Sequence, residues 1–383
     1  MKKLRVGVLF GGRSGEHEVS LVSAASVLRG LDPKKYLTVP IGITKQGRWV
    51  LPRGALPTGE LTHAVLRRAL AGGSGVLLPA EPAEASLVPA ESSTPSPPGA
   101  LHLDVVFPVL HGTYGEDGTV QGLLELADLP YVGAGVLGSA LGMDKEVAKR
   151  LFRQAGLPVA NHVAVRRHEW EKDRRGIVKA VRRTLHFPVF TKPANLGSSV
   201  GISKVCRLAE LAAAVEHAFE FDAKVLVEQG IIGREIEVSV LGNEEPVASV
   251  PGEVIPAREF YDYTAKYLED KTRFVVPARL KPRQIRRFQA LAVAAFRALE
   301  CEGMARVDFL LQRRTGKIYV NELNTIPGFT AISMYPKLWE ASGLPYPALL
   351  DRLIELALAR HRQKNRRRTS IELPSKRGGV LRE

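Results

Sequence analysis

The first segment of the chain limits its fold more than any other. Residues 4–10, LRVGVLF, form a short apolar run that ends in two glycines, and a helical pattern follows around residues 20–31. Pro33 ends this helix, and residues 39–43 are predicted to form a second strand. A strand, a turn, a helix and a second strand in this order are typical of an α/β domain with a parallel sheet.

Further elements are predicted along the rest of the chain. Helices are expected at 120–127, 144–154, 284–299 and 349–360, and single strands at 103–110, 225–228 and 235–241. Two pairs of strands are predicted to form hairpins, 188–192 with 201–204 and 305–311 with 317–321. Residues 46–100 are rich in Pro, Gly, Ala and Ser, and the end of this stretch is interpreted as a surface insertion.

The composition is that of a globular protein with a basic end. The 383 residues, 45% of them hydrophobic, can form two or three domains. Residues 360–383 hold nine Lys or Arg and two Glu, half of the net charge of +14, and are predicted to be disordered. No zinc-finger spacing or RNP-like aromatic pattern accompanies them, so specific nucleic-acid binding is not expected. A basic surface that favours an anionic nucleotide is the milder interpretation.

The sequence also favours a cytoplasmic location. No run approaches 18 apolar residues, so no membrane span is expected, and the first strand leads into a turn without a cleavage-like site. Cys206 and Cys301 are the only cysteines, which is too few for a disulfide scaffold. They are expected to be two unpaired buried thiols in a reducing compartment.

The second hairpin carries a candidate metal site. Glu322 and Asn324 are two residues apart at the end of one strand, so they point to the same face. Asp308, on the partner strand, can face them across the ladder. Three oxygen ligands around one point suit Mg²⁺, which keeps water and recruits phosphate oxygens for its other positions. A solvated acidic strand end is the alternative.

The first hairpin carries a candidate phosphate loop. Small residues between its strands, KPANLGSSVG at 192–201, let backbone N–H groups approach a phosphate, and Lys192 adds a positive charge. The segment is not a Walker A loop, because no Gly-Lys-Ser/Thr follows at the required spacing. A plain hairpin turn is the alternative.

Four further residues are weaker candidates. Lys266 lies in a polar aromatic loop that could cover a reacting centre. Arg306 shares the face of Asp308 and could reach negative charge beside a metal. Glu16, at the head of the first helix, could bind a substrate ammonium or complement the helix dipole. His111 ends a strand in a glycine-rich turn, where a structural cap is equally plausible.

Nine segments in this order strengthen the individual signals. They are GGRSGEHEVS (11–20), HGTYGEDG (111–118), MDK (143–145), KPANLGSSVGISK (192–204), VEQ (227–229), GRE (233–235), YDYTAKY (261–267), RVD (306–308) and NELNTIPGFT (321–330). Taken together, these segments resemble the D-alanine–D-alanine ligases of the ATP-grasp superfamily. The resemblance covers about residues 4–361, apart from 46–100.

The resemblance implies a fold and its divisions. The fold class is α/β, within an α+β multidomain chain, with an ATP-grasp fold after an N-terminal parallel-sheet domain. The N-terminal domain is expected at 1–138, the central domain at 139–232, the C-terminal domain at 233–362 and a basic tail at 363–383. ATP is expected between the central and C-terminal domains.

The resemblance also implies the ligands of the nucleotide and the metal. Lys145 and Lys192 would contact the phosphates and the base region, with Lys266 adding positive charge as the reaction proceeds. Glu228 and Glu235 would contact the adenine and the ribose. Asp308, Glu322 and Asn324 would hold Mg²⁺ or Mn²⁺, an assignment that the hairpin argument reaches independently.

The implied reaction is ATP-dependent ligation of two D-alanine molecules, for peptidoglycan synthesis. The first carboxylate attacks the γ-phosphate, and the free amine of the second D-alanine attacks the resulting acyl phosphate. The expected roles are ammonium binding by Glu16, lid closure by Ser198 and Tyr267, oxyanion stabilisation by Arg306 and the Gly328 N–H, binding of the second carboxylate by Ser333, and help from His111 in substrate binding.

Tyr267 bears on the choice of second substrate. Relatives that form D-alanyl-D-lactate usually have histidine at this position, and a cationic imidazole would repel an incoming ammonium. Tyr267 therefore favours the dipeptide, whereas D-serine as second substrate is harder to exclude. Another ATP-grasp ligase with a different carboxylate and amine is the alternative function. Homodimers are usual in the family, so a homodimer is expected.

Overall fold

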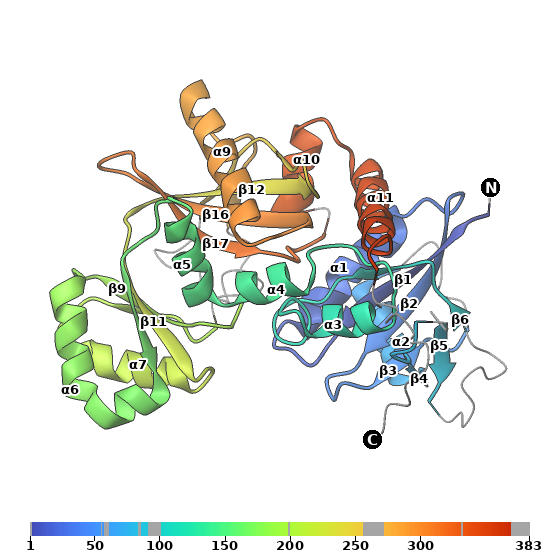
Figure 1. Ribbon diagram of the computed structural model, residues 1–383, viewed down its shortest axis with the longest axis horizontal. Coiled ribbons are helices and arrows are strands. Elements are labelled where there is room, and N and C mark those ends of the chain that lie inside the picture. The colour runs from blue at the N-terminus through green and yellow to red at the C-terminus, as the bar shows by residue number, and fades with distance from the viewer. Residues whose placement is uncertain are drawn as a thin grey trace, which may run out of the picture.

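The chain folds around three β-sheets. The computed structural model describes residues 2–54, 56, 61–82, 86–90, 101–197, 200–255, 272–330 and 332–368. Figure 1 shows the first sheet at one end of the molecule, the second at the other, and the third above and between them. Within these described ranges, no helix is long and apolar enough to cross a membrane.

The predicted strand–helix–strand start is confirmed. Strand β1 (Leu4–Gly11) pairs in parallel with β2 (Tyr36–Ile43) and with β7 (Val105–Pro108), and α1 (His17–Gly30) connects the first two. Both faces of β1 are buried: Val6, Val8 and Phe10 pack with α1, whereas Leu9 packs on the other side with α3 (Thr119–Leu126). A sheet covered on both faces is the usual setting for parallel strands.

The stretch from 46 to 100 is more regular than the sequence suggested. It contains β3 (Trp49–Leu51), α2 (His63–Ala71), β4 (Ser74–Leu77) and β5 (Ser86–Pro89), and β6 (Leu101–His102) follows. These strands extend the first sheet with antiparallel pairs in the order β6-β5-β4-β3-β2-β1-β7, so the sheet is mixed and not wholly parallel. The strands are too short for a clear alternation of polar and apolar residues.

The second sheet is antiparallel and carries the first predicted hairpin. Its order is β10-β9-β11-β8, built from β8 (His162–Arg166), β9 (Val189–Pro193), β10 (Ser203–Val205) and β11 (Lys224–Gln229). The pairing of β9 with β10 confirms that hairpin. Its apolar face packs against the helices α6 (Arg167–Thr184) and α7 (Leu211–Phe219), the latter following the short 3-10 helix η1 (Leu208–Glu210).

The third sheet has a path of five strands, β15-β14-β12-β16-β17, with β13 beside β12. The pairing of β16 with β17 confirms the second hairpin. The elements are β12 (Gly233–Gly242), β13 (Val247–Ala248), β14 (Gly252–Ile255), β15 (Arg273–Val275), α9 (Pro282–Ala298), β16 (Gly303–Gln312), β17 (Ile318–Asn324) and α10 (Met334–Ala341).

Strand alternation in the third sheet separates its core from its polar face. Ala305, Val307 and Phe309 of β16 are buried in a cluster with α9, whereas the intervening residues point the other way. Two helices connect the first sheet to the second, α4 (Val136–Met143) and α5 (Lys145–Gln154). Ala148 and Phe152 place α5 in the same core cluster, so this helix is packed on the third sheet.

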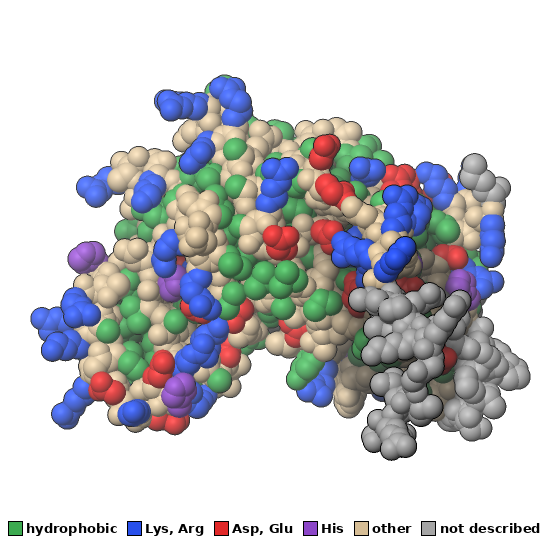
Figure 2. All heavy atoms as spheres, in the orientation of Figure 1, with side chains coloured by type: hydrophobic (Ala, Val, Ile, Leu, Met, Phe, Trp, Pro, Cys, Tyr) green, Lys and Arg blue, Asp and Glu red, His purple; other side chains and the backbone are tan. Residues whose placement is uncertain are grey.

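The last helix returns to the first sheet. Leu349, Leu353 and Ile354 of α11 (Tyr346–Lys364) share a core cluster with α1 and β1. The helix passes the predicted start of the tail at 363, and residues 369–383 lie outside the described residues. On the face in Figure 2, Lys and Arg side chains are scattered and form no single basic stripe.

The two cysteines differ in their surroundings. Cys301 is buried, and burial raises the pKa of its thiol above the usual range. Cys206 is exposed, so the expectation of two buried thiols was wrong for this residue. Both are free, as expected.

Arg360 joins α11 to the segment around Tyr131 beside the first sheet, and its removal tests this contact. Its guanidinium donates to the backbone carbonyls of Tyr131 and Gly133 and lies 4.4 Å from the centroid of the Tyr131 ring. Because hydrogen bonds to charged groups contribute about 1.5–3 kcal/mol each, we expect Arg360→Ala to lower the free energy of unfolding by roughly 2 kcal/mol in urea titrations. Arg362→Ala, at an exposed position of the same helix, is the control. Equal stabilities of the two variants would contradict the contact.

Candidate active site

Helix α5 begins directly against the predicted phosphate loop. Asp144 caps the helix by accepting from the backbone N–H groups of Glu146 and Val147, and it also pairs with Lys224. The backbone N–H of Lys145 donates to Ala194, and its Nζ donates to the carbonyl of Leu196 at 2.5 Å. The helix start therefore fixes one side of the loop, and it directs Lys145 along the loop.

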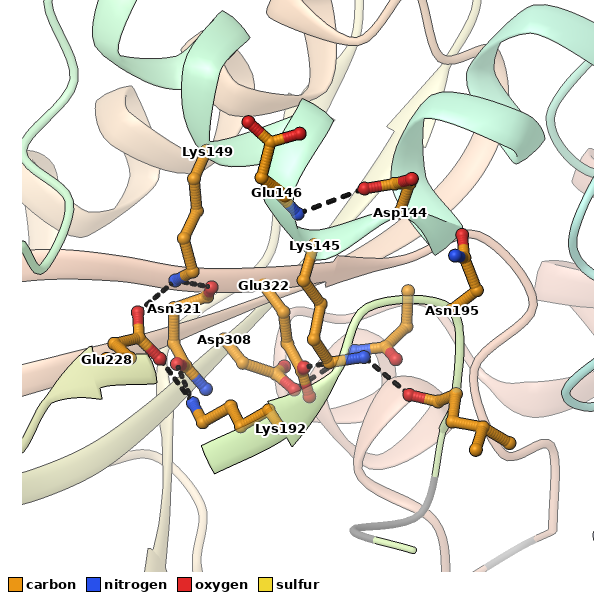
Figure 3. A network of polar contacts seen from close by, with 12 residues as sticks. Asp144, Lys145, Glu146, Lys149, Lys192, Asn195, Glu228, Asp308, Asn321 and Glu322 are labelled. Carbon is orange, nitrogen blue, oxygen red and sulfur yellow. Dashed lines mark hydrogen bonds and ion pairs between the residues drawn. The ribbon is translucent and has the colours of Figure 1, made fainter. Parts of the chain in front are cut away.

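A buried lysine–glutamate cluster lies where the second and third sheets meet (Figure 3). Glu228 of β11 is paired through Oε2 with Lys192 Nζ at 2.5 Å and through Oε1 with Lys149 Nζ at 2.6 Å. Lys149 also donates to the backbone carbonyl of Asn321 at 2.6 Å, and Lys192 lies 3.5 Å from Oδ1 of that residue. Lys149, Lys192, Glu228 and Asn321 are called the buried cluster below.

Charge within the buried cluster follows from these contacts. Burial would raise the pKa of Glu228, yet Lys149 and Lys192 hold it at about 2. Burial would lower the pKa of Lys192, but Glu228 outweighs this effect and raises it. Glu228 and Lys192 are therefore both ionised at neutral pH. Burial lowers the pKa of Lys149, although Glu228 opposes this shift.

The predicted metal ligands lie together. Asp308 is paired with Glu322 across the ladder, and the Asn324 amide donates to Asp308 at 3.0 Å. Nζ of Lys145 lies 3.7 Å from Glu322. Two carboxylates and an amide form a set of hard oxygen donors, which suits Mg²⁺ or Mn²⁺. The residues present therefore fit the metal that the resemblance implies.

Arg306 shares the face of Asp308, as the alternation of the strand predicted. Its guanidinium forms two 2.7 Å hydrogen bonds with this carboxylate, and its Nε lies 3.1 Å from Glu237. Burial would lower the pKa of Arg306, but Asp308 and Glu237 raise it well above its usual value. The arginine is therefore a fixed positive charge beside the candidate metal ligands.

Glu16 lies between three loops. It stands at the start of α1 and is buried, and its backbone N–H donates to the hydroxyl of Ser14. A side chain at Gly197 would collide with its Oε1, and one at Gly112 would lie 3.3 Å from the same atom. Both loops thus approach the carboxylate closely because these positions are glycine.

A cavity of about 40 Å³ opens beside this point. Its walls come from the phosphate loop on one side and from the end of β17 on the other. The lining residues are Glu116, Gly142, Met143, Lys145, Leu196, Gly197, Ile202, Glu322, Leu323, Asn324 and Thr325. Two of the candidate metal ligands, Glu322 and Asn324, therefore face the same cavity as the phosphate loop.

Glu116 is a second buried carboxyl group at this position. It accepts a 2.8 Å hydrogen bond from the backbone N–H of Gly112. Burial, and then the negative charge of Glu16, raise the pKa of Glu116 to about 8. Glu116 is therefore protonated at neutral pH.

His111 is held by both of its ring nitrogens. Nε2 lies 3.1 Å from the hydroxyl of Ser23, and Nδ1 lies 3.0 Å from the carbonyl of Ile326. Burial lowers the pKa of this buried imidazole, and Glu16 only partly opposes the shift. These bonds tie α1 to the 325–330 loop, which is the structural role that the sequence left open beside substrate binding.

Gly328 and Ser333 lie next to each other at the start of α10. A side chain at Gly328 would approach the Ser333 hydroxyl to 3.1 Å. This hydroxyl lies 2.7 Å from that of Thr330 and accepts from its backbone N–H at 3.1 Å. The two residues that were predicted to contact substrate are therefore adjacent in one turn.

Of the remaining predicted site residues, three lie outside the described residues and one lies on β12. Ser198, Lys266 and Tyr267 lie outside the described residues, so their roles stay predictions. Glu235, on β12 and half-buried, is close enough to raise the pKa of Lys192. Its predicted contact with the nucleotide is compatible with this place.

Lys149, Glu116 and Ser23 received no role from the sequence. Lys149 follows Lys145 by four residues, and this spacing puts both on one face of α5, which was an available signal. Glu116 was part of a recognised motif. Ser23 contacts His111 and the backbone N–H of Phe329, and no local pattern could have indicated either partner.

The fold and the site together define the class of protein. The second and third sheets meet along charged side chains, beside a first sheet with a parallel core, and this arrangement is the ATP-grasp architecture. Family models named D-ala D-ala ligase N-terminus and D-ala D-ala ligase C-terminus match residues 5–134 and 151–355. The chain belongs to the D-alanine–D-alanine ligase family.

Similar proteins extend over nearly the whole chain. It is 50% identical to a D-alanine–D-alanine ligase of Natranaerobius thermophilus over 374 residues, 97% of this chain and 99% of the relative. It is 54% identical to that of Solibacter usitatus over 363 residues, 94% and 98% of the two chains. These values leave no large segment of either relative unmatched.

Solved structures agree with this fold. The VanG D-Ala:D-Ser ligase from Enterococcus faecalis has a TM-score of 0.82 at 37% identity, covering 93% of this chain and 100% of that one. The D-alanine–D-alanine ligase from Coxiella burnetii has a TM-score of 0.81 at 38% identity, covering 96% and 97%. The predicted ATP-grasp fold class is confirmed.

Glu116→Gln tests the buried carboxyl pair through the pH dependence of stability. The unfolded carboxyl ionises near pH 4.5 whereas the folded one stays protonated to about pH 8, so the wild type loses stability as the pH rises between these values. The amide does not ionise, and its oxygen can still accept from Gly112. We therefore expect the free energy of unfolding of the variant, relative to wild type, to rise across this interval in urea titrations. A difference that does not change with pH would contradict a protonated Glu116.

Proposed function

We propose that this chain joins two D-alanine molecules to D-alanyl-D-alanine with ATP, through a D-alanyl phosphate, for bacterial peptidoglycan synthesis. The observation that carries the proposal is 50–54% identity to D-alanine–D-alanine ligases over more than nine-tenths of the chain. The site supports the same chemistry, since Lys145, Glu322 and Asn324 line one cavity and Arg306 lies beside the candidate metal ligand Asp308.

The nucleotide is proposed to lie between the second and third sheets. Lys145 and Lys192 would meet its phosphates, and Glu228 and Glu235 its adenine and ribose. Lys145 of this set also lines the cavity of about 40 Å³ beside Glu322. Asp308, Glu322 and Asn324 would hold Mg²⁺ or Mn²⁺, which would neutralise phosphate charge when bound.

Two bond-forming steps follow. A carboxylate oxygen of the first D-alanine attacks the γ-phosphorus, and ADP leaves. The second D-alanine loses a proton from its ammonium to solvent, its amine attacks the acyl carbon, and inorganic phosphate leaves with the electron pair of the broken C–O bond. A second proton passes from the nitrogen to solvent as the amide forms. Carboxylate and phosphate repel each other, so Lys192 and Lys266 would offset the negative charge of the first step.

The remaining roles belong to substrate binding and the second step. The buried Glu16 would accept the first ammonium, and Ser198 and Tyr267 would be linked to it in a network that closes a lid. Arg306 and the backbone N–H of Gly328 would stabilise the tetrahedral oxyanion, and Ser333 would bind the second carboxylate. His111 would act through the bonds that hold the 325–330 loop against α1.

A D-alanine–D-serine ligase is the second candidate, because VanG D-Ala:D-Ser ligase has the TM-score of 0.82 at 37% identity. The higher identities to D-alanine–D-alanine ligases favour D-alanine at both positions. Tyr267 argues against D-lactate, since it lacks the cationic imidazole that would repel an ammonium. We also propose a cytoplasmic homodimer, on the family resemblance alone.

A substrate panel tests the function directly. Phosphate release would be measured with ATP, Mg²⁺ and single amino acids or pairs, and the products separated by chromatography. We expect D-alanine alone to support turnover and to yield D-alanyl-D-alanine, because both subsites accept it. Release that requires D-serine beside D-alanine would favour the second candidate, and release only with other acids or amines would reject both.

Arg306→Ala tests the proposed oxyanion stabilisation. Loss of one such donor often lowers kcat by about 10²–10³, and we expect at least this loss for a charged donor. Arg306→Lys keeps the charge but cannot form the two-bonded pair with Asp308, so an intermediate kcat is expected. Thermal unfolding of both variants controls for the loss of this ion pair. Wild-type kcat in a folded Arg306→Ala variant would remove the residue from the reaction.

A further inference from the structure

We propose that Lys149 is a positioning residue of the nucleotide site: it stays on Glu228 as a permanent counter-ion, so that Lys192 can leave Glu228 for a nucleotide phosphate. The inference rests on the proposed function, because it takes Lys192 as a phosphate ligand. The reaction derived above does not use Lys149.

The two lysines of the buried cluster hold different oxygens of one carboxylate. Lys149 lies at Oε1 of Glu228 and Lys192 at Oε2, 2.6 Å and 2.5 Å away (Figure 3). Glu228 is 3% exposed, so water cannot replace either lysine at the carboxylate. A buried carboxylate that loses its only partner is strongly destabilised, whereas one that keeps a second cation is not.

The surroundings of the two lysines determine which one can leave. Lys149 is 1% exposed, extends from a helix packed in the core of the third sheet, and also donates to the Asn321 carbonyl at 2.6 Å. Lys192 is 13% exposed and lies at the end of β9, directly before the phosphate loop. Its other contact, to Asn321 Oδ1, is long at 3.5 Å. Lys149 is therefore fixed, and Lys192 is the lysine that can change partner.

Lys149 also connects the two sheets that enclose the site. Its helix packs on the third sheet, Glu228 belongs to the second, and Asn321 directly precedes the candidate metal ligand Glu322. The ammonium group of Lys149 thus holds Glu228, the proposed adenine ligand, in register with the strand that carries Glu322. A nucleotide whose base lies at Glu228 and whose phosphates lie near Glu322 requires this register.

The variant Lys149→Met removes the charge and keeps an apolar stem of similar length. Lys192 would then be the remaining cation on Glu228, and its transfer to a phosphate would leave a buried carboxylate without compensation. We expect the Kd for ADP in the presence of Mg²⁺, measured by titration calorimetry, to rise by about 10-fold or more. The KM for D-alanine should change by less than about 2-fold, because a lost positioning contact acts on the ligand that it positions.

Arg150→Met is the matched control. Arg150 follows Lys149 on the same helix, but its side chain is 60% exposed and pairs with Glu146 at 2.8 Å. This substitution removes the same charge from the same turn, so we expect an unchanged Kd for ADP. An equal loss of affinity in both variants would mean that overall charge and not position matters, and it would overturn the proposal.

A second substitution at Glu228 separates positioning from a merely structural role. Glu228→Gln should not tighten ADP binding when Lys149 is present, because it removes a proposed contact to the adenine. In the Lys149→Met background the same change removes the charge that retains Lys192, so it should tighten ADP binding. The effect of Glu228→Gln on ADP affinity therefore has opposite signs in the two backgrounds. A packing defect does not produce such coupling. Lys149→Gln, tested in the same cycle, serves if Lys149→Met does not fold.

The outcomes also distinguish this inference from the proposed function. Wild-type affinity for ADP in Lys149→Met, or an effect of Glu228→Gln with the same sign in both backgrounds, would overturn the role of Lys149 while D-alanine turnover by the wild type stands. A wild type that binds ADP but releases no phosphate with D-alanine would reject the function and leave the binding cycle valid. The expected result is weaker ADP binding in Lys149→Met that Glu228→Gln partly restores.

Discussion

A carboxylate held between two lysines is the interaction on which the arrangement of the sheets depends. Glu228 comes from the second sheet, Lys149 from a helix packed on the third, and Lys192 from the strand that leads into the phosphate loop. Because each of these groups is costly to bury alone, none can be withdrawn without another charge to replace it. The anionic nucleotide proposed for this site would supply such a charge, so its binding would be coupled to the relative placement of the two sheets.

A second electrostatic constraint acts at the substrate end. Glu16 and Glu116 both lie against the loops at Gly112 and Gly197, where two negative charges would repel each other. Protonation of Glu116 resolves this conflict, as its raised pKa of about 8 indicates. At the candidate metal ligands, the guanidinium of Arg306 neutralises the carboxylate of Asp308.

Local periodicity explains which parts of the fold and the site could be predicted from sequence. A strand repeats every two residues, so Glu322 and Asn324 share a face, and the pairing of Asp308 with Glu322 follows from one hairpin. The short strands between 46 and 100 were not predicted, because their hydrophobic pattern is brief and depends on pairing with other strands. The exposure of Cys206 was not predicted either, because the burial of a side chain depends on the whole fold. The roles of the site residues in binding and catalysis stay predictions.

The burial of Lys149 could not be predicted from the sequence. Its spacing from Lys145 already placed it on the same face of α5, but most lysines on a helix face are solvated. Whether such a charge is buried is decided by a partner elsewhere, and here the partners are a carboxylate of one sheet and a carbonyl of another. Periodicity predicts the face of the helix or strand on which a side chain lies. It does not predict which residues of other elements pack against that face. A buried ion pair between elements is therefore a property that only the assembled fold reveals.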